Sequence, residues 1–220
     1  YYAKKMGVPI SKLICASNSN NVLTDFINTG IYDKNRKFYT TCSPSMDILI
    51  SSNLERLLFD LSGNDDEYIS DIENKLFKTG KFEIKEEIKE KISDLFFASC
   101  CDDDKTLDTI KETFEKFGYL IDTHTAVAVA AYNEYKEKTG DKRPAAIAST
   151  ASPYKFTSSV LKALDKTPDS DEFKNLDVLS EVSNTSIPEP LAKLKNAKVR
   201  FNKVYGKTEL KKAVKDCLFK

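Results

Sequence analysis

Hydroxyl and amide side chains follow two apolar runs that have the character of strands. The run 8–16 and the short run 145–148 each lead into a polar turn. The polar residues of the two turns are Asn18, Asn20 and Asn21 in the first and Ser149, Thr150 and Ser152 in the second. In open α/β sheets, ligands bind beyond the carboxyl ends of strands and beside helix N-termini that favour anions. The turns therefore predict a site that holds a small anionic ligand by hydrogen bonds, with simple capping of the following helices as the alternative.

The sequence lacks the residues that several other kinds of chemistry require. The glycines stand at least seventeen positions apart, which excludes a GxGxxG loop and a P-loop. His124 is the only histidine, and no GxSxG sequence accompanies it, so a hydrolase centre is not expected. The five cysteines show no CxxC spacing, which predicts reduced thiols and no structural metal.

Composition narrows the possible partners and location. Lysine plus arginine and aspartate plus glutamate both total 34, so there is no excess positive charge for nucleic acid or an anionic membrane. No apolar run approaches the roughly 20 residues of a membrane span, and the first residues lack the apolar core of a signal peptide. We expect a cytoplasmic protein of the α/β class.

Periodicity and stop signals predict the elements that position the two turns. A helix, a strand, a polar turn and a second helix open the chain and return around residues 145–164, which is the pattern of α/β layers. The two helical patterns within residues 61–100 read as a helical insertion, and 166–184 as a polar surface segment. Helices are predicted over 22–30, 69–80, 84–95, 104–118 with Asp104 as N-cap, 125–140 and 156–164, followed by a strand-like run at 198–205 and a short helix from Thr208.

Four segments together resemble threonine synthase, in the order of that family and across essentially the whole chain. They are Tyr1–Gly7 (YYAKKMG), Ser43–Phe59 with its SPSMDI and SSNLERLLF sequences, Asp122–Ala126 (DTHTA) and Ser149–Phe156 (STASPYKF). The closing region 188–205 is similar as well. A single triplet of this kind carries no information, but the ordered combination is specific. One departure is Ser152, where many members of the family have histidine, and this weakens any role for that position.

The resemblance implies a fold-type-II enzyme, similar to tryptophan synthase β, that depends on pyridoxal 5′-phosphate (PLP). The family converts O-phospho-L-homoserine and water into L-threonine and phosphate. In this pattern Thr150, supported by Ser149, would hydrogen-bond the pyridine nitrogen of PLP, where a hydroxyl does not force that nitrogen to be protonated. The alternative role for Thr150 is a helix cap.

Four further residues are candidates for binding the substrate. His124 stands near the N-terminus of an alanine-rich helix, close to the expected substrate phosphate, or else holds the turn structurally. Arg56, at a helix start with Asn53, has the geometry to bind phosphate through two bonds, or pairs with Glu55 or Asp60. Lys155 reaches an anion or is simply solvated.

The resemblance also identifies what the chain lacks. In this family the Schiff-base lysine and the glycine-rich loop for the cofactor phosphate precede the segment seen here, so we expect no catalytic residue in this chain and no turnover by it alone. The opening YYAKKMG reads as the end of a helix, which predicts that upstream sequence has been removed. The expected domains are 1–60 and 101–165 as parts of the PLP domain, 61–100 as a helical insertion or lid, and 166–220 as a carboxyl-terminal extension.

Two other functions remain open at this stage. One is a different fold-type-II PLP lyase, such as a serine or threonine dehydratase. The other is a non-catalytic binding module of the same architecture. The sequence does not indicate the oligomeric state.

Overall fold

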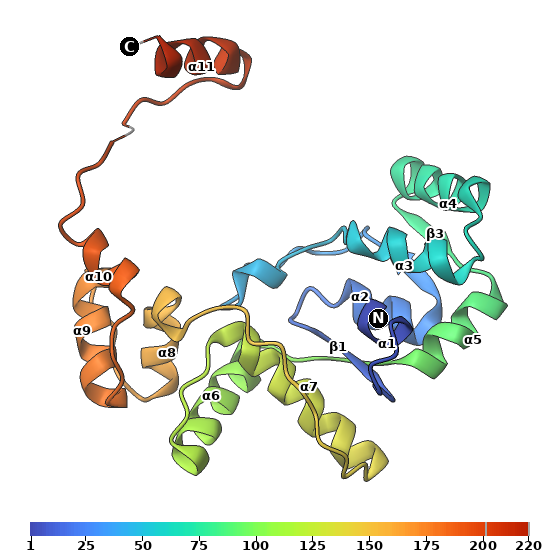
Figure 1. Ribbon diagram of the computed structural model, residues 1–220, viewed down its shortest axis with the longest axis horizontal. Coiled ribbons are helices and arrows are strands. Elements are labelled where there is room, and N and C mark those ends of the chain that lie inside the picture. The colour runs from blue at the N-terminus through green and yellow to red at the C-terminus, as the bar shows by residue number, and fades with distance from the viewer. Residues whose placement is uncertain (201, 220) are drawn as a thin grey trace. The chain divides into compact units, whose positions relative to one another are not determined.

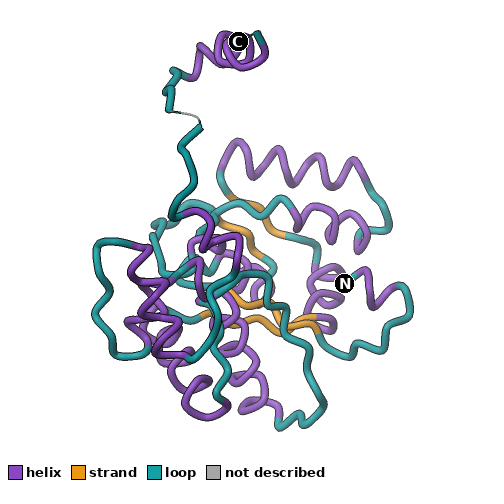
Figure 2. Tube along the Cα trace, turned by 60° about the vertical axis from the view of Figure 1, so that its left-hand side comes forward, coloured by secondary structure: helices purple, strands orange, loops and turns teal. Residues whose placement is uncertain are grey.

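The computed structural model describes residues 1–200 and 202–219, and it divides into two compact units, Tyr1–Ser186 and Ile187–Lys220. The first unit has the predicted α/β character, with helices around short strands near its centre (Figure 2). Its elements are α1 (Tyr2–Lys5), β1 (Leu13–Ser17), α2 (Val22–Thr29), β2 (Ile31–Asp33), α3 (Asn53–Leu61), α4 (Asp66–Thr79), β3 (Lys81–Glu83), α5 (Glu86–Leu95), β4 (Phe96–Cys100), α6 (Asp103–Phe117), α7 (Thr123–Thr139), α8 (Thr157–Ala163) and α9 (Glu172–Ser183).

Strands β1 and β4 form a parallel pair at the centre of the first unit. Leu13 lies opposite Phe96 and Ser17 opposite Cys100, so both strands end at the same edge. Helices α2 and α7 contact both strands (Figure 1). A parallel pair covered by helices needs the apolar composition that LICAS and FFASC provide.

The expectation of helices alone between residues 61 and 100 is wrong, because this segment contains strand β4. Its apolar residues follow α5 without a break, so the sequence carries no turn signal to separate the two elements. The segment also contains β3, which pairs antiparallel with β2. The boundaries of the predicted domains stay a prediction.

The main core joins β2 and β3 to α2, α4 and α5. The rings of Tyr32 and Phe82 stack at 5.3 Å between centroids, and Phe26 meets the Phe82 ring edge-on at 5.9 Å. All three side chains are buried. Such aromatic pairs add about 1 kcal/mol each beyond the burial of apolar area, which fixes the β2–β3 pair on α2.

Two aspartates cap α6 and α7, the two helices that follow β4 in the chain. Asp122 caps α7, and Asp102 caps α6 by accepting a bond from Lys105 N at 2.9 Å. The cap of α6 is thus Asp102 and not the predicted Asp104, because the backbone is extended at Asp102 and already helical from Asp103.

Two predictions for residues 145–184 are wrong. The run Ala145–Ala148 has no strand partner among the described residues and stays irregular, since a strand forms only where a neighbour pairs with its backbone. The segment 166–184 is not merely a surface wrap, because it contains α9. Asp171 caps α9, and Leu176 and Leu179 are buried on the side of the helix that packs on α8.

The second unit contains α10 (Glu189–Leu194) and α11 (Leu210–Leu218), with a 3-10 turn at Lys207–Glu209 before α11. The predicted helix from Thr208 is confirmed. The predicted strand at 198–205 is not formed in residues 198–200 and 202–205, and Phe201 lies outside the described residues. The Tyr205 hydroxyl donates instead to the Asp216 carboxylate at 3.0 Å, a contact local to this unit.

The cysteines of the chain are all free thiols, and burial raises the pKa of Cys15 to about 11. Within residues 1–200 and 202–219, no helix has both the length and the apolar character needed to cross a bilayer. The same residues contain no group of three or more histidine, cysteine, aspartate or glutamate side chains arranged to hold a metal ion.

Candidate functional site

Asp122 is the organising residue at the N-terminus of α7. Its side chain is fully buried. One carboxylate oxygen accepts bonds from His124 N at 2.9 Å and Thr125 N at 3.4 Å, and the other accepts from the Thr125 hydroxyl. An aspartate at an N-cap satisfies amide groups that the helix leaves unpaired, and burial strengthens each of these bonds. Asp122 therefore fixes the positions of His124 and Thr125.

His124 connects Asp122 to a distant loop. Its Nδ1 lies 3.1 Å from Asp122 Oδ1, and its Nε2 lies 3.0 Å from the backbone nitrogen of Ser45. The Ser45 N–H can only donate, so Nε2 accepts and the proton of a neutral imidazole is on Nδ1, facing the carboxylate. The ring also lies 4.7 Å from the Phe156 ring. His124 thus joins the loop Ser43–Asp47 and the turn before α8 to the start of α7.

The turn that carries Thr150 meets the same helix end. Thr125 Oγ1 and Ser149 Oγ form a hydrogen-bonded pair at 2.9 Å, next to the fully buried Asp122. Ser149 and Thr150 are both exposed. Ser152 accepts a bond from Tyr154 N at 3.3 Å and so caps the short 3-10 helix Pro153–Lys155, which is a structural role. The structure therefore links His124 to Ser149, the residue before Thr150, through Asp122 and Thr125.

A second buried network lies at the carboxyl end of β1. Asn18 donates to Thr41 Oγ1 at 2.8 Å and to Asp47 Oδ1 at 2.8 Å. Asn20 donates to Asp47 Oδ1 at 3.0 Å and accepts a bond from Tyr39 N at 2.9 Å. These bonds hold the loop 39–47 against the end of β1, so the loop is fixed from this side as well as by His124.

The remaining predicted residues lie apart from His124 or at its margin. Arg56 is exposed near the start of α3 and donates to Asn53 Oδ1 at 2.5 Å. It lines a groove with the carboxylates of Glu55, Asp66 and Glu73. Asp60, an alternative partner considered for Arg56, pairs with Lys5 at 2.5 Å. Roles of Asn53 and Arg56 in binding phosphate stay predictions.

Lys155 lies in the same turn as Phe156. It is exposed, and its Nζ lies 5.9 Å from the centre of the Phe156 ring. That ring contacts His124, so Lys155 stands one residue from the organised site. A role in binding an anion stays a prediction for this residue.

Sequence reasoning missed the roles of Asp122 and Ser45. An aspartate before an alanine-rich helix is a readable cap signal, so the capping part of the Asp122 role was accessible. The contact of Ser45 N–H with His124 was not, because the two residues are 79 positions apart and the donor is a backbone group.

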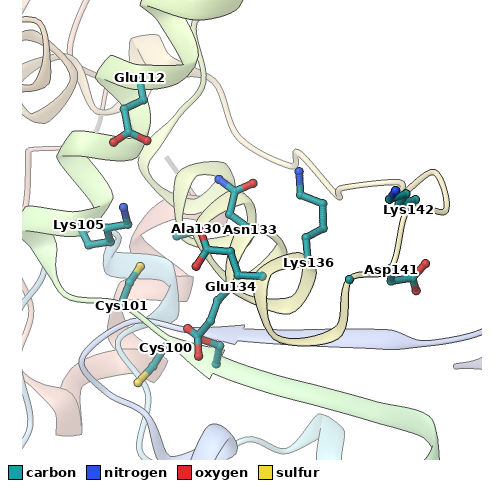
Figure 3. Close-up of a pocket in the computed structure, with 13 residues that line it drawn as sticks. Cys100, Cys101, Lys105, Glu112, Ala130, Asn133, Glu134, Lys136, Asp141 and Lys142 are labelled. Carbon is teal, nitrogen blue, oxygen red and sulfur yellow. The ribbon is translucent and has the colours of Figure 1, made fainter.

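A cavity of about 710 Å³ between α6 and α7 is distinct from this site. Figure 3 shows Lys105 and Glu112 on α6, Asn133 and Glu134 on α7, and the adjacent Cys100 and Cys101 at the end of β4. Its lining has charges of both signs and includes none of the predicted site residues. The cavity is therefore not part of the candidate site and says nothing about which ligand that site binds.

We expect replacement of His124 by alanine to release the loop Ser43–Asp47. The Ser45 amide would lose its acceptor, and a bond of this kind contributes about 1 kcal/mol, so its exchange with deuterium should accelerate about fivefold. Hydrogen–deuterium exchange of a peptide containing Ser45 measures this. Amides of α4, which lie outside the network, serve as the internal control. Unchanged exchange at Ser45 would mean that His124 does not hold the loop.

Comparison with known proteins supports a family assignment. The family model described as "Threonine synthase, C-terminal" matches residues 125–215. The human protein named Threonine synthase-like 1 is 44% identical over 164 residues, which are 74% of this chain and 22% of that protein. Threonine synthase of Saccharomyces cerevisiae is 38% identical over 212 residues, which are 90% of this chain and 39% of the relative.

Two solved structures agree with the sequence relatives. The yeast threonine synthase structure aligns with 100% of this chain and 44% of its own, at 35% identity and a TM-score of 0.85. The PLP-bound threonine synthase of Brucella melitensis aligns with 97% of this chain and 42% of its own, at 33% identity and a TM-score of 0.81. The chain spans only about a fifth to two fifths of the length of the curated relatives it matches.

The fold is therefore that of part of a fold-type-II PLP enzyme. Within that class, the chain belongs to the threonine synthase family and corresponds to the carboxyl-terminal part of its members. The resemblance found in the sequence and the fold class it implied are thereby confirmed.

Proposed function

We propose that this chain forms part of a PLP-dependent threonine synthase that converts O-phospho-L-homoserine and water into L-threonine and phosphate. The observation that carries the proposal is the meeting of three segments at Asp122: the turn with Thr150, the N-terminus of α7 and the loop Ser43–Asp47. Relatives named threonine synthase match across most of the chain, which supports the same reaction.

The residues present fit the pyridine ring of PLP. A ring nitrogen needs one hydrogen-bond partner, and Thr150 offers an exposed hydroxyl beside Ser149, whose own position is fixed by Thr125. Neither group carries a charge, so the nitrogen would not be forced to accept a proton. When bound, PLP withdraws electrons from the substrate carbons, which allows protons to leave and phosphate to depart.

The other residues would bind and orient the substrate. His124 is linked through Asp122 and Thr125 to Ser149, the residue before Thr150, and it keeps the loop Ser43–Asp47 in place. We propose that this loop and His124 contact the substrate near its phosphate. Lys155 would contribute a positive charge at the same turn. Asn53 and Arg56 would complete the phosphate site from α3, provided that the carboxylates near Arg56 are screened or displaced in the complete protein.

The proposal assigns the bond-making lysine to sequence outside these 220 residues. The chain alone would then bind and orient but not turn over substrate. A cytoplasmic location and a small-molecule substrate, without nucleic acid or membrane, belong to the same proposal. The zero net charge supports the absence of a nucleic-acid partner.

A second candidate is a PLP lyase of the same fold that acts on another substrate. The 44% identity to human Threonine synthase-like 1 favours it, because the name of that protein states no reaction. A non-catalytic module would retain the fold without binding PLP.

Phosphate release by the longer polypeptide that contains this chain distinguishes these functions. With O-phospho-L-homoserine and PLP, a threonine synthase yields phosphate and threonine in equal amounts. Ammonia released from serine or threonine would identify a dehydratase instead, and a protein that stays colourless with PLP would be a binding module. The 220-residue chain alone, tested in parallel, should release no phosphate, and release by it would contradict the assignment of the catalytic lysine.

A further inference from the structure

The N-terminus of α6 holds the loop 39–47 through a contact that is separate from those of His124 and the asparagines after β1. The carboxylate of Asp103, in the first turn of α6, accepts the backbone N–H of Cys42 at 3.1 Å on Oδ1 and 3.2 Å on Oδ2. The two residues are 61 positions apart in the chain. Asp102 caps α6, so the side chain of Asp103 is available for the loop.

The loop 39–47 depends on side-chain acceptors for its position. Side chains accept five of its backbone N–H groups, those of Tyr39, Thr41, Cys42, Ser43 and Ser45. Three of the acceptors lie outside the loop, namely Asn20 after β1, Asp103 on α6 and His124 on α7. Each backbone N–H needs a partner, so removal of one acceptor should release the loop at the point where it is bound. Asp103 is the outside acceptor that binds the loop near its middle.

The side chain of Cys42 meets the same carboxylate. Burial, the hydrogen bond of the thiol to Asp103 and the negative charge of Asp103 together raise the pKa of Cys42 to about 12. Asp103 therefore engages Cys42 through its backbone and through its side chain. Because the thiolate is the reactive form of cysteine, the reactivity of Cys42 reports on its contact with Asp103.

We propose that Asp103 is a positioning residue for the substrate phosphate, which acts through the loop 39–47 without touching the substrate. The inference rests on the proposed function, in which this loop and His124 contact the substrate near its phosphate. A loop released at Cys42 would occupy its binding position in only a fraction of the molecules, and the apparent affinity for the substrate would fall by that fraction. A negative charge suits this indirect role, because direct contact with a phosphate would be repulsive.

The alternative role for Asp103 is that of an acidic residue in the first turn of a helix. Negative side chains at this position interact favourably with the helix dipole. Asp104, the next residue, carries the same charge in the same turn of α6, but it is exposed to solvent. Asp104 therefore provides a matched control for the loss of a first-turn charge.

Kinetics of the longer polypeptide that contains this chain provide the first test. With O-phospho-L-homoserine and PLP, Asp103→Ala should raise KM at least about tenfold and leave kcat within about threefold, because binding is weakened while the reacting centre is unchanged. The inhibition constant of inorganic phosphate should rise by the same factor. Asp103→Asn retains an oxygen that accepts the Cys42 N–H, so its KM should stay within about threefold of the original. Asp104→Ala should alter neither KM nor kcat.

Two measurements on the same polypeptide follow the loop without reference to turnover. Deuterium exchange of a peptide containing Cys42 should accelerate at least about fivefold in Asp103→Ala and stay unchanged in Asp104→Ala. Alkylation of Cys42 by iodoacetamide, resolved from the other cysteines by peptide mass spectrometry, should become faster in both Asp103 variants and extend to lower pH. The reason is that the negative charge that raises the pKa of this thiol is absent from both.

The outcomes separate the role of Asp103 from the reaction. A polypeptide that releases phosphate but keeps its KM in Asp103→Ala would overturn the positioning role and leave the reaction intact. Equal effects of Asp103→Ala and Asp104→Ala would overturn it as well, since the helix charge would then be responsible. So would unchanged exchange at Cys42 in Asp103→Ala. Accelerated exchange without any phosphate release by the original polypeptide would instead overturn the proposed function, and the substrate role of Asp103 with it.

Discussion

Thr150→Val in the assembled enzyme is expected to lower kcat by about 100-fold while leaving the fold intact. Valine keeps the shape of threonine but removes the only hydroxyl that we assign to the pyridine nitrogen, and loss of one hydrogen bond at a reacting centre has an effect of this order. Because Thr150 is exposed and makes no packing contact in the core, the free energy of unfolding should change by less than about 0.5 kcal/mol. Steady-state phosphate release measures kcat.

Thr150→Ser is the matched control, since it retains the hydroxyl. Its kcat should stay within a few-fold of the original, and its absorbance with bound PLP should be unchanged. A valine variant as active as the serine variant would contradict the assignment of Thr150, and the reaction itself would remain open to the phosphate-release experiment.

Asp122→Ala is expected to destabilise the chain by about 3 kcal/mol. The loss combines an N-cap, which contributes about 1 kcal/mol, with buried donors of His124 and Thr125 that would be left unpaired, at about 1–3 kcal/mol together. The carboxylate is fully buried, so solvent does not compensate for its removal. Urea unfolding followed by circular dichroism gives the difference.

Asp171→Ala provides the comparison for this variant. Asp171 caps α9 by accepting one bond from Phe173 N at 2.9 Å, but it is exposed and joins no other segment. Its loss should cost about 1 kcal/mol. If the two alanine variants are equally stable, Asp122 is a cap alone and does not organise the site.

The sequence predicted the helices well because their signals are local. The repeats of Ile69, Ile72 and Leu76, ended by Gly80, define α4 within a few residues. Gly80 has φ of +77°, and a side-chain carbon there would meet Asn35, so glycine is required as the helix stop. Helix α9 was missed because its apolar residues do not keep to one face, as the exposed Val178 beside the buried Leu179 shows, although Asp171 before it is a readable cap.

Strands were harder to predict because their pairing is not local. Phe96–Cys100 becomes a strand only through β1, about eighty residues earlier, and nothing in its own composition separates it from α5. Ala145–Ala148 shows the opposite case, a strand-like sequence without a described partner. The polar residues at the candidate site could be listed from the sequence, but the contacts of Asp122, His124 and Ser45 depend on the fold.

The bonds of Asn18 and Asn20 have a consequence for ligand affinity. Among residues 1–200 and 202–219, no buried side-chain nitrogen or oxygen lacks a hydrogen-bond partner, and the loop 39–47 is part of that complete network. A ligand that arrives at this loop would meet a rigid surface rather than one that must be ordered. Each side chain already immobilised spares about 0.5–1.5 kcal/mol of entropy loss on binding, so recognition here would select for shape with little induced fit.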